Sequence, residues 1–350
     1  MDSKPFLLKA LELAKIRRGF CAPNPSVGAV IVSETGDILA TGYHLAAGQP
    51  HAEVDALKKL NGKAEGATIY ITLEPCCHFG RTPPCTNAIM DAGIKHVVYG
   101  MGDANPVVSG KSKAILAQKN ISCEQIELPE ITEFYRSYRY WHRTKMPYVT
   151  AKIALSLDGK SAGKNGEPIQ ITGPVAKKIT HAYRHHSDAI LTTAKTIRCD
   201  NPQLNARGEE IIAKPIYILD RELTLSLDAT IFSTAKSVTL FHGPHVTAEK
   251  NIRCIEVPET NGKLDLLSVM KHIGQDGIHD LWIEAGGLCF SECVKQGIAQ
   301  TLLIYVAPRW LGLGLTAFPT DFSLDLSHST VNWQTAGDDA ICRIQKIDSH

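Results

Sequence analysis

The 350-residue sequence lacks three features that would each define a class of protein. No apolar run approaches the ~18 residues needed to cross a bilayer, so a membrane protein is not expected. Residues 1–5 show no basic start followed by an apolar stretch, so no secretory signal is expected either. The formal net charge is only +1, without the strong positive field of a dedicated nucleic-acid binder. We therefore expect a cytoplasmic protein that acts on small molecules, with neither nucleic acid nor membrane as a partner.

Composition and cysteine usage point the same way. Hydrophobic residues make up 44% of the chain and charged residues 21%, as in globular proteins with a large core. The ten cysteines come without a secretion signal, so we expect reduced thiols, and closely spaced ones are more often metal ligands than disulfides. The length predicts two domains. We place the boundary at Met146-Pro147, which divides the chain into residues 1–145 and 146–350.

Strand and helix patterns alternate in the first part of the chain, which predicts an α/β fold in which helices cover a sheet. Helices are predicted at 4–18, 51–60, 87–92, 110–119 and 130–143, and strands at 27–32, 38–43, 67–73 and 96–100. Arginines at 136, 139 and 143 share one face of the last helix. We interpret that face as solvated or interdomain rather than as a nucleic-acid surface, although basic residues there alternate with aromatic ones.

One stretch of this part carries a chemical pattern. His51-Ala52-Glu53 opens a predicted helix, and about 20 residues later a predicted strand ends in Pro75-Cys76, followed by Cys85. A catalytic zinc takes three such protein ligands and leaves the fourth position to water. His51, Cys76 and Cys85 would be the ligands, and Glu53 would serve the bound water. The pattern is typical of zinc nucleobase deaminases, except that the second Cys follows the first by nine residues instead of three.

The alternative is a structural zinc with four ligands, in which Cys77 or His78 would be the fourth. That alternative leaves Glu53 without a role. Cys77 adjoins Cys76, and adjacent side chains at a strand end tend to point in opposite directions. Cys76 follows the proline, as the deaminase pattern requires, so we choose Cys76. His78 is interpreted as a loop or substrate-side residue.

The second part of the chain also alternates strands with helices. Strands are predicted at 148–155, 188–192, 215–219, 237–241, 251–256, 280–284 and 300–307, and helices at 174–184, 194–198, 263–273 and 288–297. The strand at 280–284 runs into Gly286-Gly287, where a helix start could bind phosphate, although a tight structural turn explains the pair equally well. A complete G-x-G-x-x-G is absent, so a Rossmann domain is not supported. Beyond Trp310 we expect packing only.

Several motifs together resemble the bifunctional deaminase/reductase family of riboflavin biosynthesis. In the first part they are Pro23-Asn24-Pro25-Ser26-Val27-Gly28-Ala29-Val30, His51-Ala52-Glu53, Glu74 to Cys85 with its long loop, and Asp103-Ala104-Asn105-Pro106. In the second part they are Ser156-Leu157-Asp158-Gly159-Lys160, Asp200-Asn201-Pro202-Gln203-Leu204-Asn205-Ala206-Arg207 and Glu284-Ala285-Gly286-Gly287.

The resemblance implies an N-terminal cytidine-deaminase-like α/β/α sandwich, followed by a dihydrofolate-reductase-like α/β domain that uses NADPH. It also implies two reactions in sequence. Zinc-dependent deamination of 2,5-diamino-6-(5-phosphoribosylamino)pyrimidin-4(3H)-one comes first. NADPH-dependent reduction of the ribosyl group of 5-amino-6-(5-phosphoribosylamino)uracil follows. A homo-oligomer is expected on the same ground.

Site residues follow from the resemblance by position. Those expected to contact the substrate are Asn24, His44, Arg81, Asp103 and Asn105 in the first domain, and Pro168, Arg184, Leu204, Arg207 and Glu284 in the second. Those expected to contact NADPH are Ala154, Gln170, Thr196, Asp200, Gly286, Gly287, Leu288, Cys289, Phe290, Ser291 and Glu292. Arg81 is the best candidate for the phosphate because its guanidinium offers a charge-assisted fork, with a solvated loop charge as the alternative.

Two points stay open in the second domain. Many family members carry Ser, a spacer and an aromatic residue where this chain has Pro168-Ile169-Gln170, so a cofactor or substrate contact there can differ. The proton donor of the reduction is Lys152, Asp200 or Glu284, because all three side chains are chemically able.

Overall fold

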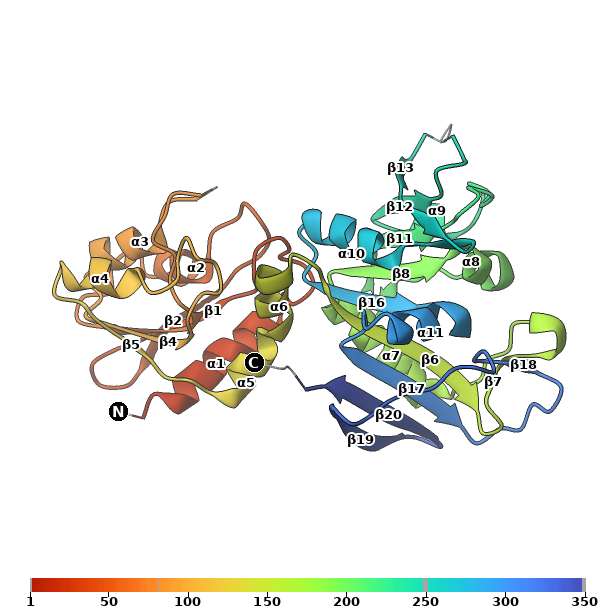
Figure 1. The fold of residues 1–350 in the computed structure, drawn as a ribbon. Helices are drawn as coiled ribbons and strands as arrows, with labels where there is room; N and C mark the ends of the chain where they lie inside the picture. The colour runs from red at the N-terminus through yellow and green to blue at the C-terminus, as the bar shows by residue number, and fades with distance from the viewer. Residues whose placement is uncertain (1, 81, 248–250, 348–350) are drawn as a thin grey trace. The chain divides into compact units, whose positions relative to one another are not determined.

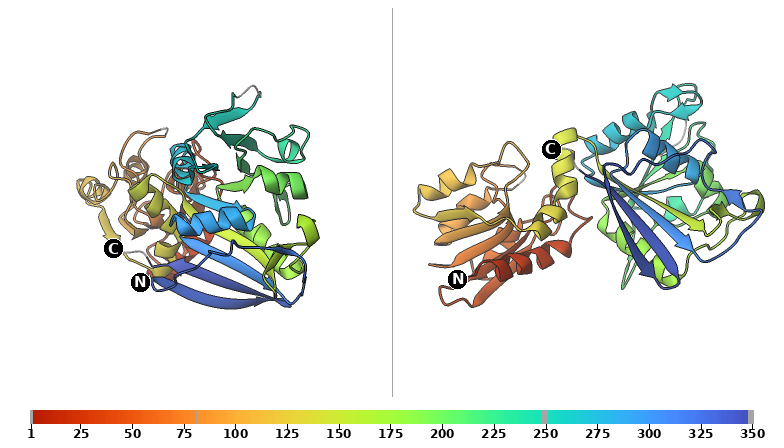
Figure 2. Two further views of the ribbon diagram at one scale, coloured as in Figure 1. Left: turned by 45° about the vertical axis from the view of Figure 1, so that its right-hand side comes forward. Right: turned by 60° about the horizontal axis from the view of Figure 1, so that its bottom comes forward.

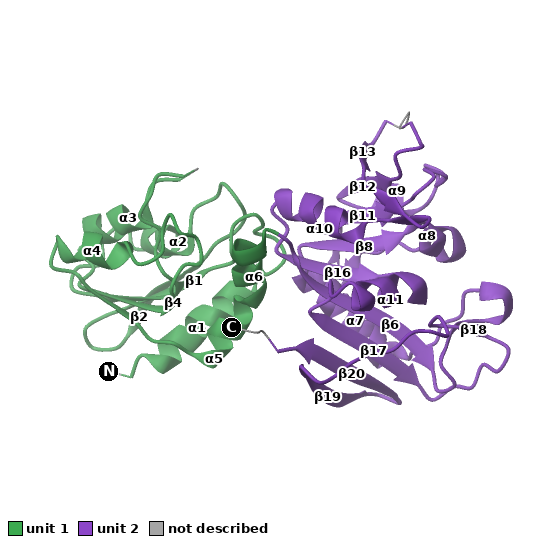
Figure 3. Ribbon diagram, in the orientation of Figure 1, with its two compact units in different colours: residues 1–145 green, residues 146–350 purple. Residues whose placement is uncertain are grey.

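The computed structural model describes residues 2–80, 82–247 and 251–347. The chain divides into two compact units, Met1–Lys145 and Met146–His350 (Figure 3). In the described ranges, no helix is both long enough and apolar enough to cross a membrane.

Unit 1 is built on the sheet that contains the strands labelled β1, β2, β4 and β5 in Figure 1. This sheet has five strands in the order β2-β1-β3-β4-β5. Strand β1 pairs antiparallel with β2 and with β3, whereas β3, β4 and β5 run parallel to one another. The strands are β1 Gly28–Val32, β2 Ile38–Tyr43, β3 Thr68–Leu73, β4 His96–Met101 and β5 Ser122–Gln125. The last of these was not predicted.

Helices cover both faces of this sheet, because successive side chains of each strand point to opposite sides. Ala29 and Ile31 of β1 pack in one apolar cluster, and Val30 and Val32 pack in another. The first face carries α2 Ala52–Lys58, α3 Cys85–Asp91 and α4 Ser112–Ala117. The second face carries α1 Lys4–Lys15, α5 Pro129–Phe134 and α6 Arg136–Thr144. The unit is therefore a three-layer α/β/α sandwich.

The single helix predicted over 130–143 is wrong, because the chain breaks at Tyr135 into α5 and α6. Tyr135 has φ −91° and ψ 11°, outside the helical region. Its buried hydroxyl lies 2.6 Å from Thr72 Oγ1 and donates to the Ser26 carbonyl at 2.9 Å. These long-range hydrogen bonds hold the side chain against β3 and account for the break.

Unit 2 contains a nine-stranded sheet with the order β13-β12-β11-β8-β16-β6-β17-β20-β19. Seven strands are parallel, and β20 and β19 extend the sheet with antiparallel pairings. The strands are β6 Tyr148–Ser156, β8 Ala189–Thr193, β11 Pro215–Leu219, β12 Ser237–His242, β13 Arg253–Glu256, β16 Asp280–Glu284, β17 Thr301–Ala307, β19 Ser329–Ala336 and β20 Asp339–Lys346. Three two-stranded pairs join β7 Lys160–Ala162 to β18 Leu315–Thr316, β9 Ala206–Arg207 to β10 Ile211–Ile212, and β14 Glu259–Thr260 to β15 Lys263–Leu264.

Helices lie on both faces of this sheet as well (Figure 2). One face packs against α10 Leu266–Gln275 and α11 Gly287–Lys295, and the other against α7 Pro174–His186, α8 Ala194–Asp200 and α9 Ile231–Thr234. A 3₁₀ turn spans Lys164–Gly166.

Two predictions for unit 2 are wrong. Helix α10 begins at Leu266 rather than at 263, because the Asp265 carboxylate caps it by accepting from the backbone N–H groups of Leu267 and Ser268. The segment beyond Trp310 does more than pack, since it supplies β19 and β20 of the main sheet.

Candidate active sites

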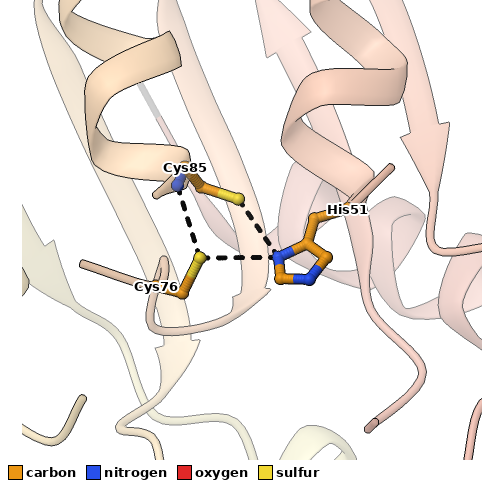
Figure 4. Close-up of side chains that lie close together, drawn as sticks. All are labelled: His51, Cys76 and Cys85. Atoms are coloured by element: carbon orange, nitrogen blue, oxygen red, sulfur yellow. Dashed lines mark hydrogen bonds between the residues drawn. The ribbon is translucent and has the colours of Figure 1, made fainter. Parts of the chain in front are cut away.

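Three side chains from three elements meet in unit 1 (Figure 4). His51 is the N-cap of α2, Cys76 follows β3, and Cys85 is the first residue of α3. The Nδ1 atom of His51 lies 3.5 Å from Cys76 Sγ and 3.3 Å from Cys85 Sγ. Among the described residues, these three form the one group whose potential metal-ligating atoms lie within 4.8 Å of one another.

The spacing of these atoms fits zinc. Zn–N bonds of about 2.0 Å and Zn–S bonds of about 2.3 Å at tetrahedral angles put nitrogen and sulfur about 3.5 Å apart. The charge state fits as well. The pKa of Cys76 is lowered to about 4, first by a hydrogen bond from Cys85 and then by His51, so this thiol is ready to act as a thiolate ligand. The pKa of Cys85 is raised, because it donates to Cys76 and is buried.

Glu53 lies beside this cluster in the first turn of α2. It is only 2% exposed, and its Oε2 atom has no hydrogen-bond partner among the described residues. Burial raises the pKa of its carboxyl, although the nearby His51 opposes that shift. An unsatisfied buried carboxyl is costly, so the geometry fits a polar partner such as a reacting water at this position.

A cavity of about 320 Å³ opens onto the cluster. Four of the predicted substrate residues line it, namely Asn24, His44, Asp103 and Asn105. Arg81, the fifth, lies outside the described residues. His78, which we interpreted as a loop or substrate-side residue, also lines the cavity.

Hydrogen bonds orient two of these side chains. His44 Nδ1 lies 3.0 Å from the Pro50 carbonyl and must be its donor, which assigns the proton to that nitrogen. His44 Nε2 then accepts from Asn24 Nδ2 at 3.2 Å. Burial lowers the pKa of His44, consistent with this neutral form. The pair leaves the Asn24 side-chain carbonyl as an acceptor for a ligand.

Sequence reasoning missed part of the cavity wall. Tyr138, Trp141 and His142 of α6 line it, whereas Arg139 and Arg143 of the same helix are exposed. Arg139 and Arg143 are therefore solvated, whereas the Arg136 side chain is only 18% exposed and pairs with Glu133. The interpretation of the whole face as solvated or interdomain stays a prediction. The sequence signal that could have revealed this wall is the ring-bearing face of α6, formed by Tyr138, Trp141 and His142.

A second group of polar side chains lies at the carboxyl edge of the parallel strands in unit 2, where open α/β sheets bind ligands. Glu284, the last residue of β16, is in register with Lys152 of the neighbouring β6. Arg184 of α7 donates to both carboxylate oxygens of Glu284, at 2.5 and 2.8 Å, and Trp282 Nε1 donates at 2.6 Å.

These surroundings lower the pKa values of both Glu284 and Lys152. Burial alone would raise the pKa of Glu284. The charge and hydrogen bonds of Arg184, the charge of Lys152 and the hydrogen bond from Trp282 together outweigh burial and lower the pKa to about 2. Burial lowers the pKa of Lys152, and Arg184 adds to that effect while Glu284 opposes it. Glu284 is thus a carboxylate at neutral pH, and Lys152 releases its proton more readily than an ordinary lysine.

Two of the other predicted substrate residues of unit 2 follow α8, Leu204 in the loop and Arg207 at the end of β9. Leu204 is buried at φ +46°, a left-handed conformation that costs free energy in a non-glycine residue and often marks a functional site. Arg207 donates to Asn205 Oδ1 and to Gln203. Arg184 also donates to the Asn205 carbonyl at 3.0 Å, so internal partners already occupy its guanidinium.

The remaining predicted contacts differ in how accessible they are. Pro168 and Gln170 lie on an exposed loop, where the Gln170 carbonyl accepts from Arg309 at 2.8 Å. Ala154 is half-buried in β6, Thr196 lies in the first turn of α8, and Asp200 is its exposed last residue.

The glycine segment divides into an open part and a packed part. No described atom outside the adjoining residues lies within 4 Å of a Cβ built on Gly286, so a ligand can approach its backbone. A Cβ on Gly287 would lie 1.5 Å from the Ala317 carbonyl oxygen, so packing alone requires glycine there. Farther along α11, Leu288 is 61% exposed, Cys289 is half-buried, Phe290 and Ser291 are buried, and Glu292 pairs with Lys263. The open start of α11 fits a cofactor phosphate.

The two units match two family models. Residues 2–101 match the cytidine and deoxycytidylate deaminase zinc-binding region, and residues 147–342 match the RibD C-terminal domain. Fold and site together define a zinc-dependent deaminase joined to a dihydrofolate-reductase-like reductase domain. His51, Cys76 and Cys85 form the zinc-binding site of the deaminase.

Relatives match along nearly the whole chain. The riboflavin biosynthesis protein RibD of Aquifex aeolicus is 38% identical over 325 residues, and that of Escherichia coli (strain K12) is 35% identical over 328 residues, each covering 89% of both chains. A solved structure of Acinetobacter baumannii RibD superposes with a TM-score of 0.88 at 32% identity over 99% of both chains. The chain belongs to the RibD family of bifunctional deaminase/reductases in riboflavin biosynthesis, whose reductase domain uses NADPH. The expected fold class, zinc dependence and pair of activities are confirmed.

Proposed function

We propose that this chain hydrolytically deaminates 2,5-diamino-6-(5-phosphoribosylamino)pyrimidin-4(3H)-one and then reduces the ribosyl group of the product with NADPH. One observation carries the first step. The buried Glu53 carboxyl lies beside the His51, Cys76 and Cys85 cluster, and its Oε2 atom has no hydrogen-bond partner among the described residues. A Thermotoga maritima protein of matching fold, with a TM-score of 0.86 at 31% identity over 98% of both chains, is described as a diaminohydroxyphosphoribosylaminopyrimidine deaminase and 5-amino-6-(5-phosphoribosylamino)uracil reductase.

The residues divide the work of deamination. When bound, zinc lowers the pKa of its water to about 7 and so makes a nucleophile available at neutral pH. Glu53 would take one proton from the attacking water and pass it to a ring nitrogen. It would then carry the remaining proton of the added hydroxyl to the amino group, which leaves as ammonia, and its raised pKa suits both directions of transfer. Asn24 and Asp103 bind polar groups of the substrate. Arg81 is retained as the proposed phosphate contact.

For the reduction, we propose that Lys152 donates the proton. Glu284 is held as a carboxylate by Arg184 and Trp282, which disfavours it as a donor. Asp200 is exposed, whereas Lys152 is partly buried in β6 and its pKa is lowered by that burial. When bound, NADPH supplies the hydride, and the backbone at Gly286 with the start of α11 would hold its phosphate. We propose that Arg184 positions Glu284 and Asn205 rather than binding the substrate phosphate, which is left to Arg207.

Glu53→Gln tests the first step. We expect ammonia release to fall by about 10²- to 10⁴-fold, the usual contribution of a general acid–base, while NADPH oxidation with the deaminated intermediate stays unchanged. Asp55→Asn, two residues along the same helix and outside the cavity lining, is the matched control. A Glu53→Gln variant that releases ammonia at the wild-type rate would refute the assignment.

Two further expectations remain proposals. We propose a cytoplasmic protein, supported by ten cysteines that are all free of disulfides. We also propose a homo-oligomer, supported by the long edge strand β19, on which Val331 and Trp333 are 41% and 63% exposed. Light scattering of the purified protein tests the assembly, and a monomer at micromolar concentration would refute it.

A further inference from the structure

Glu74 is buried between the metal-ligand strand and the loop that follows β4, and it has no assigned role in the chemistry. It is 3% exposed and immediately precedes Pro75-Cys76. Its Oε2 atom accepts from the backbone N–H groups of Asp103 at 3.3 Å and Gly110 at 3.0 Å. Its Oε1 atom accepts from Ser112, from the backbone N–H at 3.3 Å and from the hydroxyl at 2.6 Å.

These four hydrogen bonds span the loop between β4 and α4. A carboxylate can accept several hydrogen bonds from backbone donors, and such charge-assisted bonds are stronger than neutral ones. A single buried side chain thus ties both ends of the loop, at 103 and at 110–112, to the segment that carries a zinc ligand.

The loop presents Asp103 and Asn105 to the cavity, and a second element holds them. Asp103 Oδ1 accepts from the Asn105 backbone N–H at 2.8 Å and from the Tyr138 hydroxyl at 2.9 Å. Tyr138 belongs to α6 and is 6% exposed. The Asp103 carboxylate is therefore located from two sides, by Glu74 through its backbone and by Tyr138 through its side chain.

The match to the deaminase zinc-binding region ends at residue 101. Both the 102–112 loop and α6 lie beyond it, yet both line the cavity, through Asp103, Asn105 and Val108 and through Tyr138, Trp141 and His142. The segment that supplies zinc chemistry is thus separate in sequence from the segment that forms this wall.

We infer that Glu74 and Tyr138 are positioning residues that set the affinity of the deaminase for its substrate by placing Asp103. The inference rests on the proposed deamination, in which Asp103 binds substrate. Neither residue exchanges a proton with the reacting atoms. Their loss should raise KM for the pyrimidine while zinc stays bound.

Glu74→Gln and Tyr138→Phe test this inference in the full-length, zinc-loaded protein. Glutamine keeps one acceptor oxygen and replaces the other with an NH₂ group, so the donors that face that group lose their acceptor. We expect KM for deamination to rise about tenfold or more in Glu74→Gln and about threefold to tenfold in Tyr138→Phe, with a smaller change in kcat. Amide exchange of residues 102–112 should accelerate in Glu74→Gln.

A double-mutant cycle separates positioning from general destabilisation. If Tyr138 acts through Asp103, Tyr138→Phe should add nothing to the KM of Asp103→Asn. Tyr140→Phe on the same helix, outside the cavity lining, is the control, and the reduction of the deaminated intermediate should be unaffected throughout. Should Glu74→Gln fail to fold, Ser112→Ala and Tyr138→Phe carry the same test.

Failure of the positioning role and failure of the proposed deamination would give different experimental results. A wild-type protein that releases no ammonia from the pyrimidine would refute the proposed deamination itself. An active wild type whose Tyr138→Phe and Glu74→Gln variants keep its KM, or whose effects in the Asp103→Asn background simply add, would overturn the positioning role alone.

Discussion

The Arg184–Glu284 pair offers the sharpest test of the reductase unit, through the substitution Glu284→Gln. The pKa of Glu284 falls from an ordinary 4.5 to about 2, mainly because Arg184 lies against it. The group is buried, so solvent screening is small. The difference corresponds to about 3 kcal/mol of folding free energy at neutral pH.

The sign of the pH dependence follows from the depressed pKa. Stabilisation is fully present above the unfolded value of about 4.5 and is lost as the pH falls toward 2. Protonated Glu284 resembles glutamine, so the gap between the wild type and Glu284→Gln should be largest above pH 5 and should close in acid.

Urea unfolding at several pH values measures this gap. Tryptophan fluorescence serves as the signal, because Trp282, Trp310 and Trp333 all lie in unit 2. Asp321→Asn, which breaks an exposed pair with Lys295, is the control and should change little. A gap that is absent at pH 7, or that persists unchanged at pH 3, would refute the assignment of this stabilisation to the Glu284 carboxylate.

Three further predictions concern the zinc ligands, the packing at Gly287 and the proton donor of the reduction. Cys85→Ser should lose zinc and ammonia release but keep NADPH oxidation, whereas Cys77→Ser should keep its zinc. Metal analysis of both variants tests this, and zinc retained by Cys85→Ser would contradict the ligand set. Gly287→Ala should destabilise unit 2 or shift α11, since its Cβ would meet the Ala317 carbonyl, while Gly286→Ala should fold normally; equal melting temperatures would count against this packing argument. Lys152→Met should lower kcat of the reduction and leave NADPH affinity intact, as fluorescence titration can show, and an unchanged kcat would exclude Lys152 as the proton donor.

The residue pattern within short segments of the sequence was enough to predict the metal centre. His51 and Glu53 are two residues apart at a helix start, and Cys76 and Cys85 lie at a strand end and a helix start. Such boundaries follow from hydrophobic periodicity and from proline, both of which are properties of short segments. Cys76 was chosen over Cys77 because it follows the proline, as the deaminase pattern requires, and the grouping of Cys76 with His51 and Cys85 agrees with that choice.

Only the tertiary structure decided which distant side chains support those residues. Arg184 and Glu284 are 100 residues apart, and they meet at one edge of a sheet in which β8, β16 and β6 are neighbours out of sequence order. Tyr138 reaches Asp103 from a helix whose cavity-lining face the sequence did not identify. Periodicity reveals which face of an element is buried, but not which element covers it. Sheet order and helix packing decide that, because they depend on the free energy of the whole fold.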